Sequence, residues 1–371
     1  MRILILVSKL NGGGAERVAS LWANGFVSRN HKVAIAICAK DRHNEYPLDD
    51  SVIVYNIGKY KLTRYLFYRN VFFGAYCYRK VINQFQPDVL IAVLPPNAYY
   101  AKKALLGRHI PIINTEHNAF EKPPYLPISK NDSNHKFKWN KLYDHVTVIT
   151  QADKDYIGDR LRNVSVLPNP LAYNPLRIIP EKKKTILAVG RFGVWHCKGF
   201  DILIKAWAKI ASKYPEWELR IVGAIASEKE SFSYLSNLIS KYHIDSQVQL
   251  LSFSENIDKM YRESSIFVLS SRYEGFGMVL IEAMSQGCAC IACDYKGRQS
   301  EIITRPEEGI ICPVDDADSL SLAIDKMISD DAYRKDVQYN SLKRAEYYSL
   351  ENTMNRWDNI LNSVVYKSPS K

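Results

Sequence analysis

The first 27 residues, MRILILVSKLNGGGAERVASLWANGFV (residues 1–27), contain the pattern that decides the fold. A continuous apolar run over residues 3–7 predicts a buried strand, glycines at 12–14 break it, and residues 15–27 carry apolar side chains at helical spacing. A second apolar run follows at 31–39. This order of strand, glycine turn, helix and strand predicts a parallel sheet that is covered by helices on both faces.

The same alternation continues and then restarts after a proline-rich stretch. Further strand-like runs lie at residues 51–57, 89–93, 110–114, 145–150 and 164–167. Four prolines within residues 167–180 mark a linker, because proline disfavours both helix interiors and central strands. Beyond the linker, strand-like runs at 185–189, 218–222, 248–251, 266–269 and 289–292 alternate with helical patterns at 200–213, 228–242 and 278–286. The sequence therefore predicts an α/β fold with two Rossmann-like parallel-sheet domains.

The length and composition agree with two folded domains. A chain of 371 residues exceeds the size at which one core keeps growing, and 47% hydrophobic residues supply large cores. We assign residues 1–170 and 171–345 to the two domains, and we expect a helical segment at 346–371 to pack back toward the N-terminal domain. No apolar run is long enough to span a bilayer, and the run at 3–7 is too short for a signal peptide, so we expect a cytoplasmic protein.

The charge and the cysteines restrict the partners only broadly. A formal net charge of +11 favours anionic partners, among them nucleotide phosphates, an acidic lipid surface and nucleic acid. The run CACIAC at 288–293 is open to interpretation as a thiolate metal cluster, but it lacks a full ligand set. A buried strand is the better interpretation, and we expect no metal site.

Two loops suit a phosphate ligand, one through backbone amides and the other through basic side chains. The glycine turn with Gly13 and Gly14 brings backbone N–H groups to a helix start, although a plain structural turn is an equal alternative. Arg17 stands where the dinucleotide fingerprint needs glycine or alanine, which counts against a nicotinamide cofactor. In VGRFGVWHCKGFD (189–201), Arg191 and Lys198 could neutralise a leaving diphosphate, with ordinary surface charge as the alternative.

The most informative segment is SRYEGFGMVLIEAMSQG (residues 271–287), which passes from a strand end through a glycine loop into a helix. Gly275 and Gly277 let backbone amides approach a ligand. Carboxylates accept hydrogen bonds from pairs of sugar hydroxyls, so Glu274 and Glu282 suit a hexose and a ribose, respectively. The alternative for Glu282 is an ion pair with a neighbouring strand.

Two features of the first half remain. In INTEHNAF (113–120), His117 follows a strand end, where ligands of such sheets collect, although a structural hydrogen bond is an alternative role. Residues 51–87 contain no Asp or Glu but hold many aromatic side chains and six basic ones. The basic residues of this stretch are Lys59, Lys61, Arg64, Arg69, Arg79 and Lys80. Such a face suits an anionic membrane surface or a polyprenyl lipid, with an ordinary basic helix edge as the alternative.

Together these motifs resemble the retaining glycosyltransferases of family 4, which have the GT-B fold. The resemblance covers nearly the whole chain and rests on GGGAER (12–17), EHN (116–118), VGR (189–191) with the following KG, and two glutamates with seven residues between them. Among these enzymes the chain looks most like bacterial transferases that assemble lipid-linked oligosaccharide, capsule or the O-antigen of lipopolysaccharide.

The resemblance implies two domains that face each other across a cleft. It assigns His117, Glu274, Arg191 and Lys198 to the reacting centre, with no metal and no cofactor. The donor-binding residues that it implies are Gly13, Gly14, Arg191, Lys198, Glu274, Gly275, Phe276, Gly277, Met278 and Glu282. Three departures from the family pattern affect the donor pocket: a longer loop before Lys198, a reduced glycine turn at Gly223-Ala224, and KGRQSEII (296–303) where paired glycines are common.

We therefore expect transfer of a hexose or N-acetylhexosamine from a nucleotide diphosphate sugar, with uridine as the favoured base. The expected acceptor is a lipid-linked glycan or polysaccharide precursor at the inner face of the membrane, approached by the surface of Lys59, Lys61, Arg64 and Arg69. The alternatives are a nucleotide-sugar epimerase of the same architecture and a non-catalytic glycan- or nucleotide-binding protein. We expect no nucleic-acid partner, because the chain contains no nucleic-acid motif.

Overall fold

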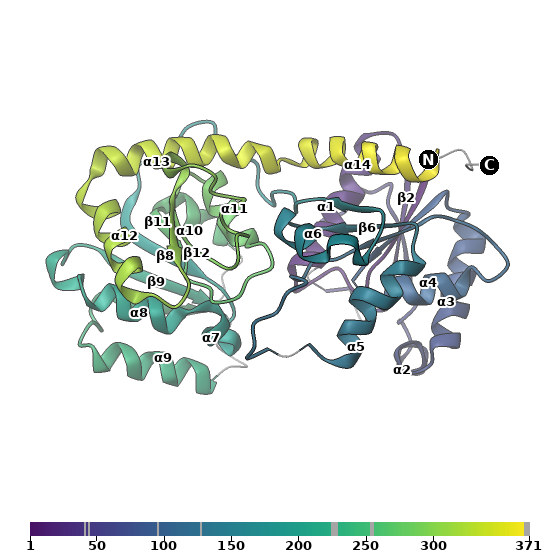
Figure 1. The fold of residues 1–371 in the computed structure, drawn as a ribbon, viewed down its shortest axis with the longest axis horizontal. Helices are drawn as coiled ribbons and strands as arrows, with labels where there is room; N and C mark the ends of the chain where they lie inside the picture. Colours follow the sequence, from purple (N-terminus) through teal and green to yellow (C-terminus); the bar gives the residue numbers. More distant parts are fainter. Residues whose placement is uncertain are drawn as a thin grey trace. The chain divides into compact units, whose positions relative to one another are not determined.

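The computed structural model describes residues 1–40, 42–43, 45–94, 96–126, 128–223, 229–252 and 256–366. By their internal contacts the residues form two compact units (Figure 1). Unit 1 contains Met1–Ala172 and Leu350–Lys371, and unit 2 contains Tyr173–Ser349. Within the described part of the chain, no helix combines the length and the apolar character needed to cross a bilayer.

Unit 1 is built on a parallel sheet with the strand order β3-β2-β1-β4-β5-β6-β7 among its described residues. The strands are β1 (Arg2–Leu6), β2 (Lys32–Ile37), β3 (Ile53–Asn56), β4 (Val89–Val93), β5 (Ile112–Thr115), β6 (His145–Val148) and β7 (Val164–Val166). β1 pairs with β2 on one side and with β4 on the other, and its residues from Ile3 to Leu6 are fully buried. The order reverses between β1 and β4, and ligands of such sheets bind beyond the carboxyl ends of strands at this point.

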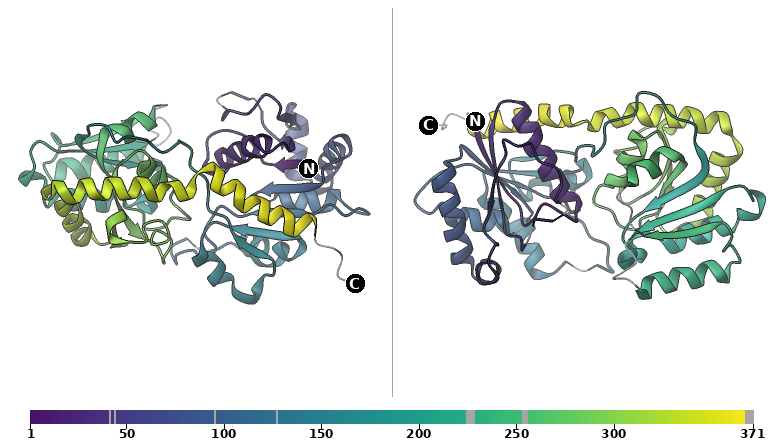
Figure 2. Two further views of the ribbon diagram at one scale, coloured as in Figure 1. Left: turned by 90° about the horizontal axis from the view of Figure 1, so that it is seen from above. Right: turned by 180° about the vertical axis from the view of Figure 1, so that it is seen from behind.

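The helices of unit 1 cover this sheet on both faces (Figures 1 and 2). They are α1 (Gly14–Ser28), α2 (Lys61–Arg69), α3 (Val71–Phe85), α4 (Asn97–Ala104), α5 (Lys130–Ser133), the π-helix η1 (Asn134–Trp139), η2 (Asn140–Leu142), α6 (Gln151–Ile157), η3 (Gly158–Arg160) and α14 (Leu350–Val365). The basic stretch at 51–87 contains β3 and two helices, and the second helix starts where the Asn70 side chain accepts hydrogen bonds from the amides of Phe72 and Phe73.

The C-terminal helix α14 belongs to unit 1 and packs against α1, beside which it lies in Figure 2. The Trp22 and Trp357 rings meet edge to face at 5.0 Å, and a side chain at Gly25 would collide with Met354. Arg29 forms an ion pair with Asp358. α14 therefore covers the face of α1 that carries Trp22.

Unit 2 is built on a second parallel sheet with the strand order β10-β9-β8-β11-β12-β13 among its described residues. The strands are β8 (Lys183–Val189), β9 (Glu218–Gly223), β10 (Val248–Ser252), β11 (Ser264–Leu269), β12 (Ala289–Asp294) and β13 (Ile310–Pro313). The helices are η4 (Phe192–Val194), α7 (Trp195–Lys198), α8 (Phe200–Ala208), η5 (Ala211–Lys213), α9 (Lys229–Lys241), α10 (Ile257–Glu263), α11 (Met278–Ser285), η6 (Pro306–Glu308), α12 (Ala317–Ser329), α13 (Asp331–Ala345) and η7 (Glu346–Tyr348). β8 and β11 are the central strands, and the loops that follow them carry the predicted donor residues.

The strand pattern and the α/β class that the sequence predicts are confirmed. The run at 288–293 lies in the buried strand β12, as its apolar neighbours indicate. The sequence pattern did not reveal β13, a short edge strand whose residues are mostly half-buried or exposed. The predicted helix at 200–213 ends at Ala208 and is followed by a 3₁₀ turn. Ala224 of the reduced glycine turn and Glu228 of the predicted helix at 228–242 lie outside the described residues.

Candidate functional site

The turn between β8 and α8 carries the two basic residues that the sequence singles out. Arg191 directly precedes η4 and is exposed. Lys198 ends α7 and is followed by Gly199, whose φ is +64°. A side chain at Gly199 would lie 1.9 Å from the Ser270 carbonyl oxygen, so the turn packs directly on the end of β11. Only glycine fits this position.

Glu274 lies in the loop after β11 and meets Lys198. Lys198 Nζ is 2.6 Å from Glu274 Oε2, and the Ser271 hydroxyl donates to the same oxygen at 3.3 Å. Both charged side chains keep about a fifth of their surface exposed (21% for Lys198 and 17% for Glu274). The structure thus brings together two of the predicted site residues from segments 76 positions apart in the chain. A partly exposed acid and base in contact can exchange their partners when a polar ligand arrives.

The loop from Glu274 ends at Gly277, the residue before α11, with a φ of +99°. Gly275 is half-buried and Phe276 is buried, and the Phe276 carbonyl accepts a hydrogen bond from Gln299 Nε2 at 3.2 Å. Met278 begins α11, so the amides of residues 275–278 lie at a helix start. Such amides carry partial positive charge and suit an anionic or hydroxyl-bearing ligand.

Glu282 lies inside α11 and is 5% exposed. The hydroxyl of the fully buried Tyr261, in α10, donates to Glu282 Oε2 at 3.1 Å. Burial and the Glu282 carboxylate raise the pKa of Tyr261, so this hydroxyl keeps its proton and remains a donor. Glu282 thus accepts a hydrogen bond from a neutral hydroxyl, and the alternative role of an ion pair with a neighbouring strand stays a prediction.

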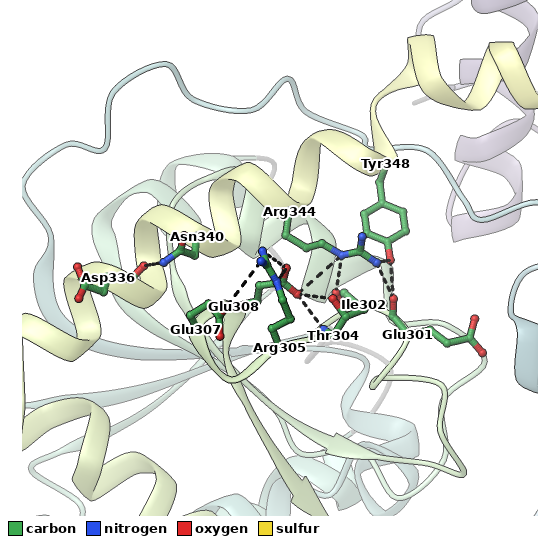
Figure 3. A network of polar contacts seen from close by, with 10 residues as sticks. All are labelled: Glu301, Ile302, Thr304, Arg305, Glu307, Glu308, Asp336, Asn340, Arg344 and Tyr348. Atoms are coloured by element: carbon green, nitrogen blue, oxygen red, sulfur yellow. Dashed lines mark hydrogen bonds and ion pairs between the residues drawn. The ribbon is translucent and has the colours of Figure 1, made fainter.

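The loop KGRQSEII (296–303) supports the loop of Phe276. Figure 3 shows Arg344 of α13 pointing at this segment, where its Nε donates to the Ile302 carbonyl at 3.0 Å and its Nη2 donates to the Glu301 carbonyl at 2.8 Å. Gln299, in the same segment, holds the Phe276 carbonyl. The segment that departs from the expected glycine pattern is therefore fixed on one side to α13 and on the other side to the predicted donor loop.

In unit 1 the glycine turn leads directly into α1. Gly13 is the residue before the helix, and Gly14 is its first residue. A side chain at Gly13 would collide with the carboxylate of Glu16, the acid in the first turn of α1. Because an acid at this position already interacts favourably with the helix dipole, a diphosphate at Gly13 and Gly14 would have to displace the Glu16 side chain.

His117 follows β5 and faces α1. Its Nδ1 lies 3.2 Å from Asn169 Oδ1, its Nε2 lies 3.1 Å from the Thr115 hydroxyl, and its ring centre is 5.5 Å from that of Trp22. These two side-chain contacts fix the orientation of the ring. Burial lowers the pKa of His117 to about 4, and the imidazole is therefore neutral at physiological pH.

Buried polar side chains stabilise the loop of His117. Glu116, at 3% exposure, accepts from Asn140 Nδ2 at 2.9 Å and from Asn114 Nδ2 at 3.2 Å. Lys136, in the π-helix η1, is 5% exposed and donates to the Ala119 carbonyl. Burial raises the pKa of Glu116 and lowers that of Lys136 to about 8.

The basic and aromatic stretch forms a surface on α2 and the start of α3. Several of its apolar side chains are strongly exposed, with 76% for Phe72, 69% for Leu62 and 68% for Tyr60. Lys59, Lys61 and Arg69 are exposed, and Arg64 is half-buried because one guanidinium nitrogen donates to the Gly58 carbonyl. We call the residues from Lys59 to Tyr76 that face solvent the α2–α3 surface.

Three contacts that matter for the site were not identified from the sequence. They come from Arg272, which binds the loop of Lys198, from Tyr261, which binds Glu282, and from Asn169, which binds His117. Each joins segments that are distant in the chain. Arg272 lies in the segment 271–287 and its partner Asp201 lies in the segment 189–201, and their opposite charges were the available signal.

Two family profiles match the chain. "Glycosyl transferases group 1" matches residues 177–344, and "Glycosyltransferase Family 4" matches residues 12–173. Three curated relatives cover nearly all of the chain. They are an uncharacterized glycosyltransferase of Haemophilus influenzae (26% identity, 95% of this chain and 97% of the relative), the amylovoran biosynthesis glycosyltransferase AmsD of Erwinia amylovora (27%, 97% and 99%), and an α-1,4-N-acetyl-D-galactosaminyltransferase of Campylobacter jejuni (23%, 98% and 99%).

Solved structures have the same fold. A sucrose-phosphate synthase from Thermosynechococcus elongatus superposes with a TM-score of 0.82 at 18% identity and covers 99% of this chain and 100% of its own. HepE of Anabaena, solved in complex with UDP and glucose, superposes with a TM-score of 0.76 at 18% identity and covers 98% of this chain and 100% of its own. At these identities the likeness shows the fold alone.

Proposed function

The chain belongs to the family 4 glycosyltransferases of GT-B fold, and we propose that it transfers a hexose or an N-acetylhexosamine from a uridine diphosphate sugar to a lipid-linked glycan or polysaccharide precursor. The observation that carries this proposal is the contact between Lys198 and Glu274 at the start of α11. One cation suited to a diphosphate and one carboxylate suited to sugar hydroxyls lie side by side there, next to the amides of a helix start.

The donor assignment is supported by the surroundings of Glu282. A buried carboxylate that is held by a tyrosine hydroxyl can accept hydrogen bonds from two adjacent hydroxyls, as a ribose offers. HepE of Anabaena is described in complex with UDP and glucose, which agrees with a uridine donor for a chain of the same fold.

We propose that the reaction needs no metal ion. As the bond between the sugar and the diphosphate breaks, negative charge develops on the leaving phosphate, and Arg191 with Lys198 and the amides at the start of α11 would stabilise it. The acceptor hydroxyl would attack from the face that the nucleotide leaves, so that the anomeric configuration is retained. His117 would lie on the acceptor side as a neutral hydrogen-bonding group.

The acceptor is proposed to be attached to a lipid. The relative from Campylobacter jejuni is named for an acceptor on diphosphate-linked undecaprenol, and AmsD is named for amylovoran biosynthesis. The α2–α3 surface adds a reason from this chain, because it combines exposed basic and apolar side chains without an acid between residues 51 and 87. We therefore propose peripheral binding to the inner face of the cell membrane.

None of these relatives is described as an epimerase, so the epimerase alternative is not supported. The test of the transferase proposal is a thermal-shift series of the purified protein with UDP, GDP, ADP and dTDP, with and without divalent metal, since a ligand that binds the native state raises the melting temperature. We expect selective stabilisation by UDP that EDTA does not change. Stabilisation by none of these nucleotides would refute the donor site, and an inverted anomeric centre in the product would refute the mechanism.

Membrane binding has a separate test. Replacing Lys59, Lys61, Arg64 and Arg69 by Gln should release the protein from anionic liposomes, since each basic residue near such a surface contributes about 1 kcal/mol. A matched control replaces four basic residues of unit 2, Lys183, Lys184, Lys213 and Lys259, by Gln. Equal co-sedimentation of both variants and the parent would refute the assignment of the α2–α3 surface.

A further inference from the structure

Arg272 is a buried cation beside the predicted donor residues that the proposed chemistry does not use. Its side chain is 9% exposed, and its Nη1 and Nη2 donate to the two carboxylate oxygens of Asp201 at 2.7 and 2.8 Å. Its Nε donates to Asp315 Oδ1 at 2.9 Å. These acids raise the pKa of Arg272, and the guanidinium lowers that of Asp201. A buried charge is tolerated because it is paired and hydrogen-bonded in this way.

The same residue is bound to the backbone of the turn that leads to Lys198. Arg272 Nη1 donates to the His196 carbonyl at 2.7 Å, and the Arg272 amide donates to the Cys197 carbonyl at 2.8 Å. The Ser270 hydroxyl donates to the Lys198 carbonyl at 2.8 Å. Three successive carbonyls of α7 are thus held by the loop after β11.

These contacts fix the backbone on both sides of the contact between Lys198 and Glu274. Lys198 follows Cys197 directly, and Glu274 lies two residues beyond Arg272. With the backbones held, the two flexible side chains can separate, so that the ammonium turns to a phosphate and the carboxylate to a sugar. A loosened backbone would instead let both groups drift from the positions that a diphosphate sugar requires, and small displacements of a positioned group weaken binding and catalysis.

We propose that Arg272 is a positioning residue for donor binding, which holds the turn of Lys198 against the loop of Glu274 through its fork to Asp201 and its contacts with the backbone. The inference rests on the proposed function, because it takes Lys198 as the ligand of the diphosphate. Lysine cannot replace arginine in this role, since an ammonium lacks the planar fork that binds a carboxylate and a carbonyl at the same time.

The experiment compares the binding of UDP and UMP by titration calorimetry to the full-length protein and its Arg272→Lys variant. UMP lacks the second phosphate, so it reports the nucleoside contacts without the full diphosphate contact. We expect Arg272→Lys to lower the affinity for UDP about 10-fold or more and to change the affinity for UMP less than 3-fold, because a displaced Lys198 would lose its contact with the second phosphate. A matched control is Arg305→Lys, which changes a largely exposed arginine of the same unit and should leave both affinities unchanged.

Ser270→Ala tests the same contacts with a smaller risk to folding, because it removes one hydrogen bond to the Lys198 carbonyl and no charge. We expect a loss of UDP affinity of about 2- to 4-fold with UMP unchanged. A merely structural role would lower the melting temperature of Arg272→Lys and leave the ratio of UDP to UMP affinity at the parent value, which would overturn the inference.

Lys198→Met separates this inference from the proposed function. If Lys198→Met leaves UDP affinity unchanged, the donor site itself is wrong. If Lys198→Met weakens UDP while Arg272→Lys and Ser270→Ala keep the parent ratio of affinities, the donor site stands and the role of Arg272 is refuted.

Discussion

The turn of Lys198 and Glu274 in unit 2 and the loop of His117 in unit 1 both follow the carboxyl end of a strand in a parallel sheet, yet they treat charge in opposite ways. In unit 2 the buried Arg272 contacts two carboxylates, and Lys198 and Glu274 form an ion pair and remain partly exposed. In unit 1 burial outweighs pairing, raises the pKa of Glu116 and lowers that of His117 to about 4.

This difference in charge between the two loops shows that similar parallel sheets can carry two kinds of ligand-binding surface. Charged groups that remain accessible suit a phosphate ligand, whose own charge they must neutralise. A neutral imidazole, held by Asn169 and packed on Trp22, suits a hydroxyl group and keeps a fixed orientation.

The largest effect is expected for Glu274→Ala. If Glu274 contacts the sugar as its bond breaks, turnover should fall by about 10²- to 10³-fold, which equals roughly 3–4 kcal/mol of lost transition-state stabilisation. The Michaelis constant for the donor should change much less. The measurement is release of UDP from the donor sugar, with the exposed acid variant Glu216→Ala as the control. An equal or larger loss in His117→Ala would reverse the contrast between the two regions.

The second effect is expected for Glu282→Ala. Loss of a carboxylate that binds ribose should raise the Michaelis constant for the donor by about 30-fold, near 2 kcal/mol, with turnover nearly unchanged. Binding of 2′-deoxy-UDP provides the sharper test, because the parent should prefer UDP and the variant should not. If both proteins discriminate equally between the two nucleotides, Glu282 does not contact the ribose.

Most of the fold could be predicted because its inner strands, among them β1 and β4, contain continuous buried apolar runs. β13 was missed because an exposed edge strand lacks that signal. The site residues Lys198 and Glu274 could be proposed from local motifs, whereas their contact depends on how β8 and β11 pair in the sheet. The contacts of Arg272, Tyr261 and Asn169 join residues that are distant in the sequence and lie close together only in the folded chain. Motif spacing therefore could not predict these contacts.

The third prediction concerns the pH dependence of unit 1. His117 binds a proton with a pKa of about 4 in the folded chain and 6.5 in the unfolded chain, so the unfolded state binds more protons between these values. Stability should therefore fall as the pH drops from 6.5, by at most about 2 kcal/mol at pH 5.

Trp22 and Trp357 pack near His117 in unit 1, and their signal contributes to the tryptophan fluorescence that is measured during denaturant unfolding. His117→Gln should lose less stability than the parent as the pH drops from 6.5 to 5. His109→Gln, which changes a largely exposed ring, should lose as much stability as the parent. If the parent and His117→Gln lose stability in parallel between pH 6.5 and 5, the imidazole of His117 is charged in the folded protein and the contrast with unit 2 fails.

The smallest effect is expected for Tyr261→Phe, which removes one hydrogen bond to Glu282 and leaves the ring packing in place. A hydrogen bond to a charged group contributes about 1.5–3 kcal/mol when it is intact, but ordered water or a bound ribose can restore part of it. We expect the Michaelis constant for the donor to rise about 5-fold, turnover to stay constant, and preference for UDP over 2′-deoxy-UDP to weaken without vanishing. This result would show that Glu282 must be oriented by a buried neighbour, as we propose for Lys198. Donor binding would then depend on a buried positioning residue at both places. A Tyr261→Phe protein that matches the parent in both measurements would show that α11 alone orients Glu282.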